Sequence, residues 1–183
     1  MLYPVDSYDP SQKNKKGLKP YLVRSFLSIP IAFLLSFLVK TFLLYPLTVK
    51  TNTMAPGILP GKTAYIKSWF SVQNLQYGDI ILFKNPQNDA LLLARVIASS
   101  GDKIQIRNKT ILKNGRILQE TYKILQSDKR KPFRSTFSRR DNLDTIQIKK
   151  GYYWLMVDNR DEGLDSRELG PIPENAIVGK LLF

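Results

Sequence analysis

The chain has 183 residues, 43% of them hydrophobic and 23% charged, with a formal net charge of +13. This length can build one moderate hydrophobic core and one membrane-spanning helix. The sequence contains neither cysteine nor histidine, which excludes a disulfide framework, a thiolate or imidazole metal site and a Ser-His-Asp triad. A hydrolase built from it would need a lysine or a carboxylate as general base. We expect no metal and no other cofactor.

The positive charge is scattered among strand-like segments and their turns instead of being gathered in one motif. No helix-turn-helix, zinc or RNA-recognition signature accompanies it, so we expect no nucleic acid partner. Attraction to anionic headgroups is the simpler explanation of the charge, and membrane lipid is therefore an expected partner.

The N-terminal part of the chain predicts a membrane anchor. Residues 1–20 form a polar, basic tail, and residues 21–47 are largely apolar. A helix of about 25 residues, at ~1.5 Å per residue, crosses a hydrocarbon layer of ~30 Å, with Lys40 reaching toward one face. The basic tail would then lie in the cytoplasm. A cleaved secretory signal is the alternative, but the bulky residues 44–47 do not form a small-x-small cleavage site.

Residues 48–183 have the pattern of an all-β domain. Short runs rich in β-branched and aromatic residues are bounded by Gly, Asn or Pro, which is typical of strands. Such runs cover residues 79–83, 91–98, 103–106, 144–148 and 152–157. The pair Asn114-Gly115 predicts a tight antiparallel hairpin, because both central positions of that turn need positive φ.

Residues 119–142 are polar, basic and weakly periodic, and we predict an extended excursion from the sheet. Their basic side chains form either a solvated loop or a contact with lipid or a partner. These side chains belong to Lys129, Arg130, Lys131, Arg134, Arg139 and Arg140.

Four short segments, each weak alone, occur in an ordered series. They are residues 51–56, residues 78–83, residues 94–102 and residues 158–170. Together they resemble the type I signal peptidases, membrane proteases that remove signal peptides. The resemblance covers most of the β region and implies a signal-peptidase-like antiparallel β-sheet domain behind one N-terminal transmembrane helix. It also implies a location at the plasma (inner) membrane, with the β domain on the outer, periplasmic or extracellular, side.

The resemblance assigns the catalytic positions residue by residue. Thr53 stands where the family has its serine nucleophile, and Ala94 stands where it has the lysine that acts as general base. Gly163 falls on the serine that helps to orient this lysine, and Thr51 falls on the hydroxyl thought to assist the oxyanion. The neighbouring positions that the family uses for substrate binding hold Asn52, Met54 and Pro56.

Two of these residues have a second interpretation. Met54 belongs either to the substrate groove or to the core, and Thr51 could be a β-favouring residue only. The other matched polar residues are expected to form structural ion pairs and hydrogen bonds, with direct substrate contact as the alternative. They are Asp79, Arg95, Asp158, Asn159, Arg160, Asp165, Ser166 and Arg167.

The three substitutions act on one reaction step. A serine hydroxyl is a poor nucleophile at neutral pH, and the family resemblance implies a buried, uncharged lysine that removes its proton. Alanine accepts no proton, and the extra methyl of Thr53 stiffens its side chain and crowds the approach to a carbonyl. Losing a general base removes at least ~10²-fold of rate. A base could still come from Lys84 or Lys103 on a loop.

We therefore predict a catalytically impaired or inactive homologue that binds signal peptides of exported preproteins or pairs with an active signal peptidase. Strand addition of a peptide uses main-chain hydrogen bonds, which need neither Thr53 nor Ala94. The alternative is an active signal peptidase with Thr53 as nucleophile and a non-standard lysine as base. A basic membrane-surface module without a groove is a third possibility.

Overall fold

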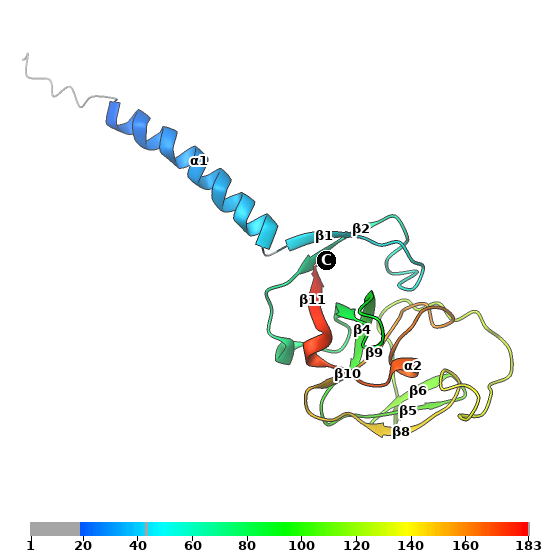
Figure 1. The fold of residues 1–183 in the computed structure, drawn as a ribbon. Helices are drawn as coiled ribbons and strands as arrows, with labels where there is room; N and C mark the ends of the chain where they lie inside the picture. The colour runs from blue at the N-terminus through cyan, green and yellow to red at the C-terminus, as the bar shows by residue number, and fades with distance from the viewer. Residues whose placement is uncertain (1–18, 43, 183) are drawn as a thin grey trace, which may run out of the picture. The chain divides into compact units, whose positions relative to one another are not determined.

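The computed structural model describes residues 19–42 and 44–182, and it divides into two units, Met1–Val39 and Lys40–Phe183 (Figure 1). The predicted basic tail, residues 1–20, therefore lies almost entirely outside the described residues. Each unit is described by itself below.

The first unit contains helix α1 (Lys19–Phe42) as far as Val39, with Pro30 inside the helix. Apolar side chains along it, such as Phe26, Phe33 and Phe37, are exposed. Within the described part of the chain, no helix reaches the length and hydropathy expected of a membrane span.

The end of α1 corrects the sequence prediction, which continued the anchor to residue 47. The helix ends at Phe42, and Leu44–Thr48 form strand β1. Pro46 lies in this strand; it has no amide hydrogen to donate and disfavours helix in the residue before it. Pairing with a strand about twenty residues later, from Leu44 opposite Lys67 to Thr48 opposite Thr63, replaces the helical hydrogen bonds.

The second unit holds two antiparallel sheets, which confirms the predicted antiparallel β domain. In spatial order, the seven-stranded sheet contains β1, β2 (Thr63–Lys67), β11 (Ile177–Leu182), β3 (Ile80–Lys84), β4 (Leu91–Ala98), β9 (Tyr152–Met156) and β10 (Ile172–Pro173). The four-stranded sheet contains β7 (Arg116–Ile117), β6 (Thr110–Lys113), β5 (Lys103–Arg107) and β8 (Leu143–Gln147). Short helical turns are η1 (Val72–Asn74), α2 (Ser166–Leu169) and η2 (Glu174–Ala176).

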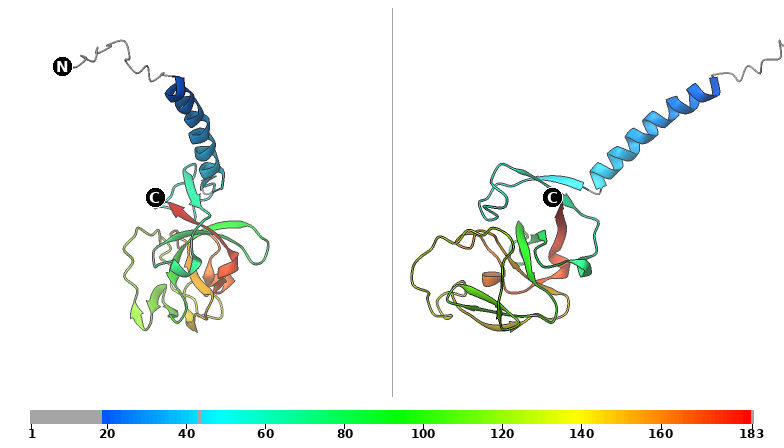
Figure 2. Two further views of the ribbon diagram at one scale, coloured as in Figure 1. Left: turned by 90° about the vertical axis from the view of Figure 1, so that its left-hand side faces the viewer. Right: turned by 180° about the vertical axis from the view of Figure 1, so that it is seen from behind.

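The predicted hairpin joins β6 to β7. Asn114 has a φ of 53° and Gly115 a φ of 79°, as the two central positions of such a turn require. The strands of this smaller sheet gather at the end of the domain away from β1, in the front, side and rear views (Figures 1 and 2).

Strand β4 connects the two parts of the core. Ala94 and Val96 pack in a cluster under the larger sheet, whereas Ile97 packs in a second cluster beside the smaller sheet, around Trp154. The division follows the length of the strand: Leu93, Ala94 and Val96 belong to the first cluster, and Ile97 and Ala98 at its end belong to the second. The residue at position 94 is therefore held within packed apolar side chains.

Residues 119–142 lie between β7 and β8 and are tied to the chain that follows β9. Leu125 forms a parallel bridge with Asn159. The Asp161 carboxylate accepts hydrogen bonds from the backbone and hydroxyl of Ser127 and from the backbone of Asp128. This segment therefore supports the loop of residues 158–165.

Candidate active site

Thr53 lies in a tight turn after β1 that is fastened to the loop following β9. The Asn159 amide donates to the Thr53 carbonyl at 2.9 Å, and the Asn159 side chain donates to the Asn52 carbonyl at 3.3 Å. The hydroxyls of Thr51 and Thr53 share a hydrogen bond of 3.0 Å. The structure thus brings the predicted nucleophile and oxyanion positions together, and Thr53 itself is half-buried.

The other residues of this turn differ in exposure. Asn52 and Pro56 are exposed. Met54 is 0% exposed and packs in the larger core cluster, so its side chain fills the core and does not line the groove. Of the two interpretations offered by the sequence, the structure places Met54 in the core, and the substrate-binding assignment is corrected.

Gly163 lies directly against Thr53. A Cβ atom at position 163 would be 2.6 Å from Cγ2 of Thr53, closer than real Cβ contacts, and 3.1 Å from its Cβ, which is a tight contact. The φ of Gly163 is +91°, a backbone conformation that residues with side chains rarely adopt. The Thr53 methyl therefore occupies the volume in which a side chain at position 163 would begin. Threonine at position 53 and glycine at position 163 are thus sterically compatible.

Ala94 is opposite Ile81 in the β3–β4 pairing and is 0% exposed. The alternative lysines do not compensate for it: Lys84 is exposed at the end of β3, and Lys103 belongs to the smaller sheet. Neither lines the groove described next.

A groove of about 720 Å³ runs past the Thr53 side chain. Thr51, Thr53 and Gly163 line it, and the remaining walls are mostly aliphatic. The aliphatic lining consists of Leu47, Val49, Leu82, Leu91, Leu92, Leu93 and Leu164. Among these described lining residues the one charged side chain is Lys50, which is exposed.

One wall of this groove is a strand with a free edge. Strand β4 pairs with β3 along Leu91–Arg95, but its pairing with β9 begins only at Arg95. In the described structure the other edge of Leu91–Ala94 therefore has no partner strand. An extended peptide can add to such an edge through main-chain hydrogen bonds.

A buried ion pair fastens β4 to the loop that follows β9. Arg95 donates to Asp158 at 2.8 and 2.5 Å and to the Gly78 carbonyl at 2.7 Å. Its guanidinium also lies 4.1 Å from the centre of the Tyr122 ring. Gly57 packs against this pair, since a Cβ there would lie 3.1 Å from the Asp158 carboxylate. The contacts of Arg95 and Asp158 are thus structural.

The segment that begins α2 is similarly fixed by buried polar groups. Asp165 caps the helix by accepting from the Arg167 amide, and its carboxylate also accepts from the Arg167 guanidinium at 2.8 Å. Burial alone would lower the pKa of Arg167, but the Asp165 carboxylate outweighs burial and raises this pKa. The Ser166 hydroxyl accepts from the Leu155 amide, which joins the segment to β9.

The remaining matched residues also make structural contacts. Asp79 accepts from the Gln76 amide at 2.9 Å and pairs with Lys180 at 2.7 Å. Arg160 is buried and pairs with Glu120. Among the described residues, no group of three or more acidic side chains is arranged to hold a metal ion.

Arg140 is a site neighbour that the sequence analysis did not single out. Its guanidinium donates to the carbonyls of Gly163 and Arg160 and pairs with Glu168. The sequence shows it within a basic run, which is the pattern of a solvated loop, so no local signal distinguishes it from Arg139.

The arrangement is an antiparallel β domain with a hydroxyl-bearing turn beside an aliphatic groove. Comparison with known proteins identifies the family. The model of the family described as signal peptidase, peptidase S26, matches residues 22–183. The chain belongs to this family, as its sequence segments predicted.

Individual relatives are similar along most of their length. The chain is 32% identical over 176 residues to signal peptidase IB of Staphylococcus aureus (strain N315), covering 91% of this chain and 90% of the relative. It is 30% identical over 158 residues to signal peptidase I of Bacillus amyloliquefaciens, covering 85% of this chain and 81% of the relative. A crystal structure of a signal peptidase I from Enterococcus faecalis V583 matches with a TM-score of 0.49 at 25% identity, covering 61% of this chain and 100% of that one.

Proposed function

We propose that this chain is a catalytically impaired or inactive member of the signal peptidase family that retains the peptide groove. The observation that carries the proposal is the environment of Ala94: a methyl group, fully buried among apolar side chains, stands at the position of the general base. Without a proton acceptor the Thr53 hydroxyl is a poor nucleophile. The aliphatic groove and the free edge of β4 do not depend on that acceptor.

The proposed ligands are signal peptides of exported preproteins, or an active signal peptidase that presents an extended segment. The free edge at Leu91–Ala94 supports strand addition, and aliphatic walls suit small apolar side chains at alternate positions. Nucleic acid is not among the proposed partners.

We further propose that the helical part of the predicted anchor, residues 21–42, attaches the chain to the plasma (inner) membrane, with the N-terminus in the cytoplasm and the β domain on the outer side. The exposed apolar side chains of α1 support contact with lipid, and the basic residues before it support this orientation. Anionic lipid would attract the remaining positive charge.

The test combines turnover and binding. The full chain is reconstituted in lipid vesicles and incubated with a preprotein carrying an Ala-x-Ala cleavage site. We expect saturable binding of the signal peptide without cleavage. Cleavage at the rate of an active relative would overturn the proposal, and absence of binding would favour a membrane-surface module without a peptide groove.

A gain-of-function series sharpens this test. The triple change Thr53→Ser, Ala94→Lys and Gly163→Ser supplies the nucleophile, the base and the hydroxyl that orients the base. We expect cleavage to rise by at least ~10²-fold over the unmodified chain, because base and nucleophile act as a unit. The matched control is Thr53→Ser with Gly163→Ser but without Ala94→Lys, which should remain near background.

One arrangement favours the alternative of an active peptidase. The Thr53 hydroxyl is held by Thr51 at 3.0 Å, and Lys50 lines the same groove. If cleavage is observed, Thr53→Ala and Lys50→Met should each abolish it, with Lys62→Met as an exposed control. Lys50 is exposed, whereas the family mechanism needs an amine sheltered from water, so we favour the impaired homologue.

A further inference from the structure

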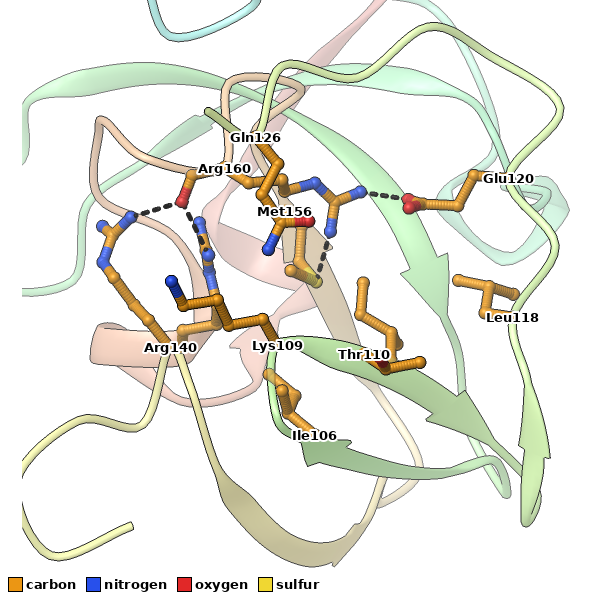
Figure 3. Close-up of a pocket in the computed structure, with 11 residues that line it drawn as sticks. Ile106, Lys109, Thr110, Leu118, Glu120, Gln126, Arg140, Met156 and Arg160 are labelled. Carbon is orange, nitrogen blue, oxygen red and sulfur yellow. Dashed lines mark hydrogen bonds and ion pairs between the residues drawn. The ribbon is translucent and has the colours of Figure 1, made fainter. Parts of the chain in front are cut away.

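A second cavity, of about 170 Å³, shares no lining residue with the groove. Its walls come from β5, β6 and the turn between them, from β9, the loop after it and α2, and from the segment of residues 118–140 (Figure 3). Residues 158–167 thus contribute to both sites: Gly163 lines the groove, and Arg160 and Arg167 line this cavity.

The wall of this cavity carries an excess of cationic side chains. Lys109, Arg140, Arg160 and Arg167 line it, against the single carboxylate of Glu120. The carboxylate partners of the other three cations lie outside the lining; they are Asp128, Glu168 and Asp165. Lys109 already donates to the Asp128 and Arg130 carbonyls and pairs with the Asp128 carboxylate, so the spare N–H donors of the cavity belong to its arginines.

Glu120 is itself occupied. It pairs with Arg160 and accepts a hydrogen bond of 2.7 Å from the Tyr122 hydroxyl. Burial raises the pKa of Tyr122, and the Glu120 carboxylate raises it further, so this phenol stays a donor. Two donors on one carboxylate reduce its repulsion of a second anion in the cavity.

Arg160 has fewer acceptors than its burial requires. It is 4% exposed, and its Nε has no acceptor among the described residues. One terminal nitrogen donates to the sulfur of Met156 at 3.2 Å, a weak acceptor, and another pairs with Glu120 (Figure 3). Buried polar atoms without partners are rare in folded proteins, so this guanidinium indicates a further acceptor in the cavity.

We propose that this cavity binds a small phosphate-bearing anion through Arg160 and its cationic neighbours. A guanidinium fork matches the geometry of phosphate oxygens, and a lysine adds a point charge. The cavity is smaller than the ~300–1,000 Å³ of pockets for drug-sized ligands, which restricts it to a phosphate group or a similarly small oxyanion. The source is either free inorganic phosphate or the phosphomonoester headgroup of a lipid.

The test uses the intact protein in neutral phosphatidylcholine vesicles with inorganic phosphate as the probe. Binding is measured by calorimetry while sodium chloride keeps the ionic strength constant. The variant is Gln126→Glu: Gln126 lines the cavity and is exposed, so the change adds a negative charge at little structural cost. The matched control is Gln147→Glu, an identical change at an exposed position on β8 outside the lining.

We expect saturable phosphate binding that Gln126→Glu weakens about tenfold, because a like charge within a few ångströms repels the anion and salt screens it only partly. Gln147→Glu should change the affinity less than about twofold. No saturable binding at millimolar phosphate, or equal weakening by both variants, would overturn the proposal; water would then satisfy Arg160.

A second arm identifies the source of the phosphate group. Vesicles containing phosphatidic acid are compared with neutral vesicles in the same phosphate titration. Loss of the free-phosphate signal in phosphatidic acid vesicles, together with weaker binding of Gln126→Glu than of Gln147→Glu to those vesicles, assigns the site to the lipid headgroup. An unchanged titration assigns it to the soluble anion.

Discussion

At the scale of single residues, Thr53 and Gly163 form a matched pair although 110 positions separate them in the chain. The Thr53 methyl fills the space that Gly163 leaves open, and the Gly163 conformation depends on having no side chain. A serine at either position, introduced alone, therefore tests packing as well as chemistry.

We expect Gly163→Ser alone to destabilise the domain by about 2–3 kcal/mol, from contact with Thr53 and from positive φ. Adding Thr53→Ser removes the methyl and should recover about 1 kcal/mol, a coupling measured by a double-mutant cycle in urea unfolding. The matched control is Gly61→Ser, because Gly61 has a φ of +82° but open space around it. Equal cost at both glycines, with no recovery, would argue against the steric pairing.

The Arg95–Asp158 pair belongs to the same scale. Its side chains are 8% and 0% exposed, so Asp158→Asn leaves a buried guanidinium without its counter-charge. We expect a loss of about 3–5 kcal/mol of unfolding free energy. Lys180→Met, which breaks the more exposed pair with Asp79, should cost less than about 1 kcal/mol. A small effect of Asp158→Asn would mean that Arg95 finds another acceptor.

At the scale of secondary-structure elements, local sequence patterns predicted most of what depends on neighbours in the chain. The β-branched runs and the Asn-Gly turn identified β3, β4, β5, β8, β9 and the β6–β7 hairpin to within a residue or so. The sequence analysis placed the end of the helix too late, because the apolar residues 44–47 are compatible with both a helix and a strand. Only their pairing with β2, distant in sequence, selects a strand.

For the candidate site too, the sequence predicts which residues belong to it but not the contacts that depend on the fold. Thr51, Thr53, Ala94 and Gly163 could be nominated from ordered motifs, but their contacts could not. Whether Met54 faces the groove or the core depends on how the turn docks onto β9 and its following loop. Arg140 was missed because the carbonyls that it reaches lie about twenty residues away and are common to every residue type.

Asp161 offers a test of how the segment of residues 119–142 is attached. Burial on its own would raise the pKa of Asp161, but the hydrogen bonds from Ser127 and Asp128 outweigh it and lower this pKa. A carboxyl group with a lowered pKa in the folded state stabilises the fold above its unfolded value of ~3.9. That contribution disappears as the pH falls through the folded value.

We therefore expect the amides of Ser127 and Asp128 to exchange with solvent faster below about pH 4, after correction for intrinsic exchange rates. In Asp161→Asn the protection of these two amides should be low already at pH 6 and nearly independent of pH. Protection that survives the substitution would show that other contacts attach the segment.

At the scale of the whole molecule, the two units differ in how far their apolar side chains are buried. The β domain buries two clusters of apolar residues and exposes others singly, whereas α1 leaves apolar side chains exposed along its length. Exposed apolar surface of this extent needs lipid or protein to cover it. This contrast supports the proposed membrane attachment of the chain.

The attachment can be tested by placing charges on α1. We expect Ile31→Lys combined with Leu34→Lys to reduce membrane integration, at an apparent cost of about 2.5–3.5 kcal/mol for each lysine near the centre of a span. Cell-free synthesis with vesicles, followed by alkaline extraction, measures the integrated fraction. Ile117→Lys with Phe137→Lys, at exposed positions of the β domain, is the control and should leave that fraction unchanged.

The contacts of the 119–142 segment determine which segments a chimera between family members has to transplant. Ser127 fastens Asp161 from 34 positions away, and Arg140 fastens Gly163 from 23. The 119–142 segment therefore supports the loop beside Thr53, and none of the four family motifs includes this segment. A chimera that transplants only those motifs would carry the catalytic positions without the contacts that hold the loop. A chimera that also carries residues 119–142 should keep the groove intact.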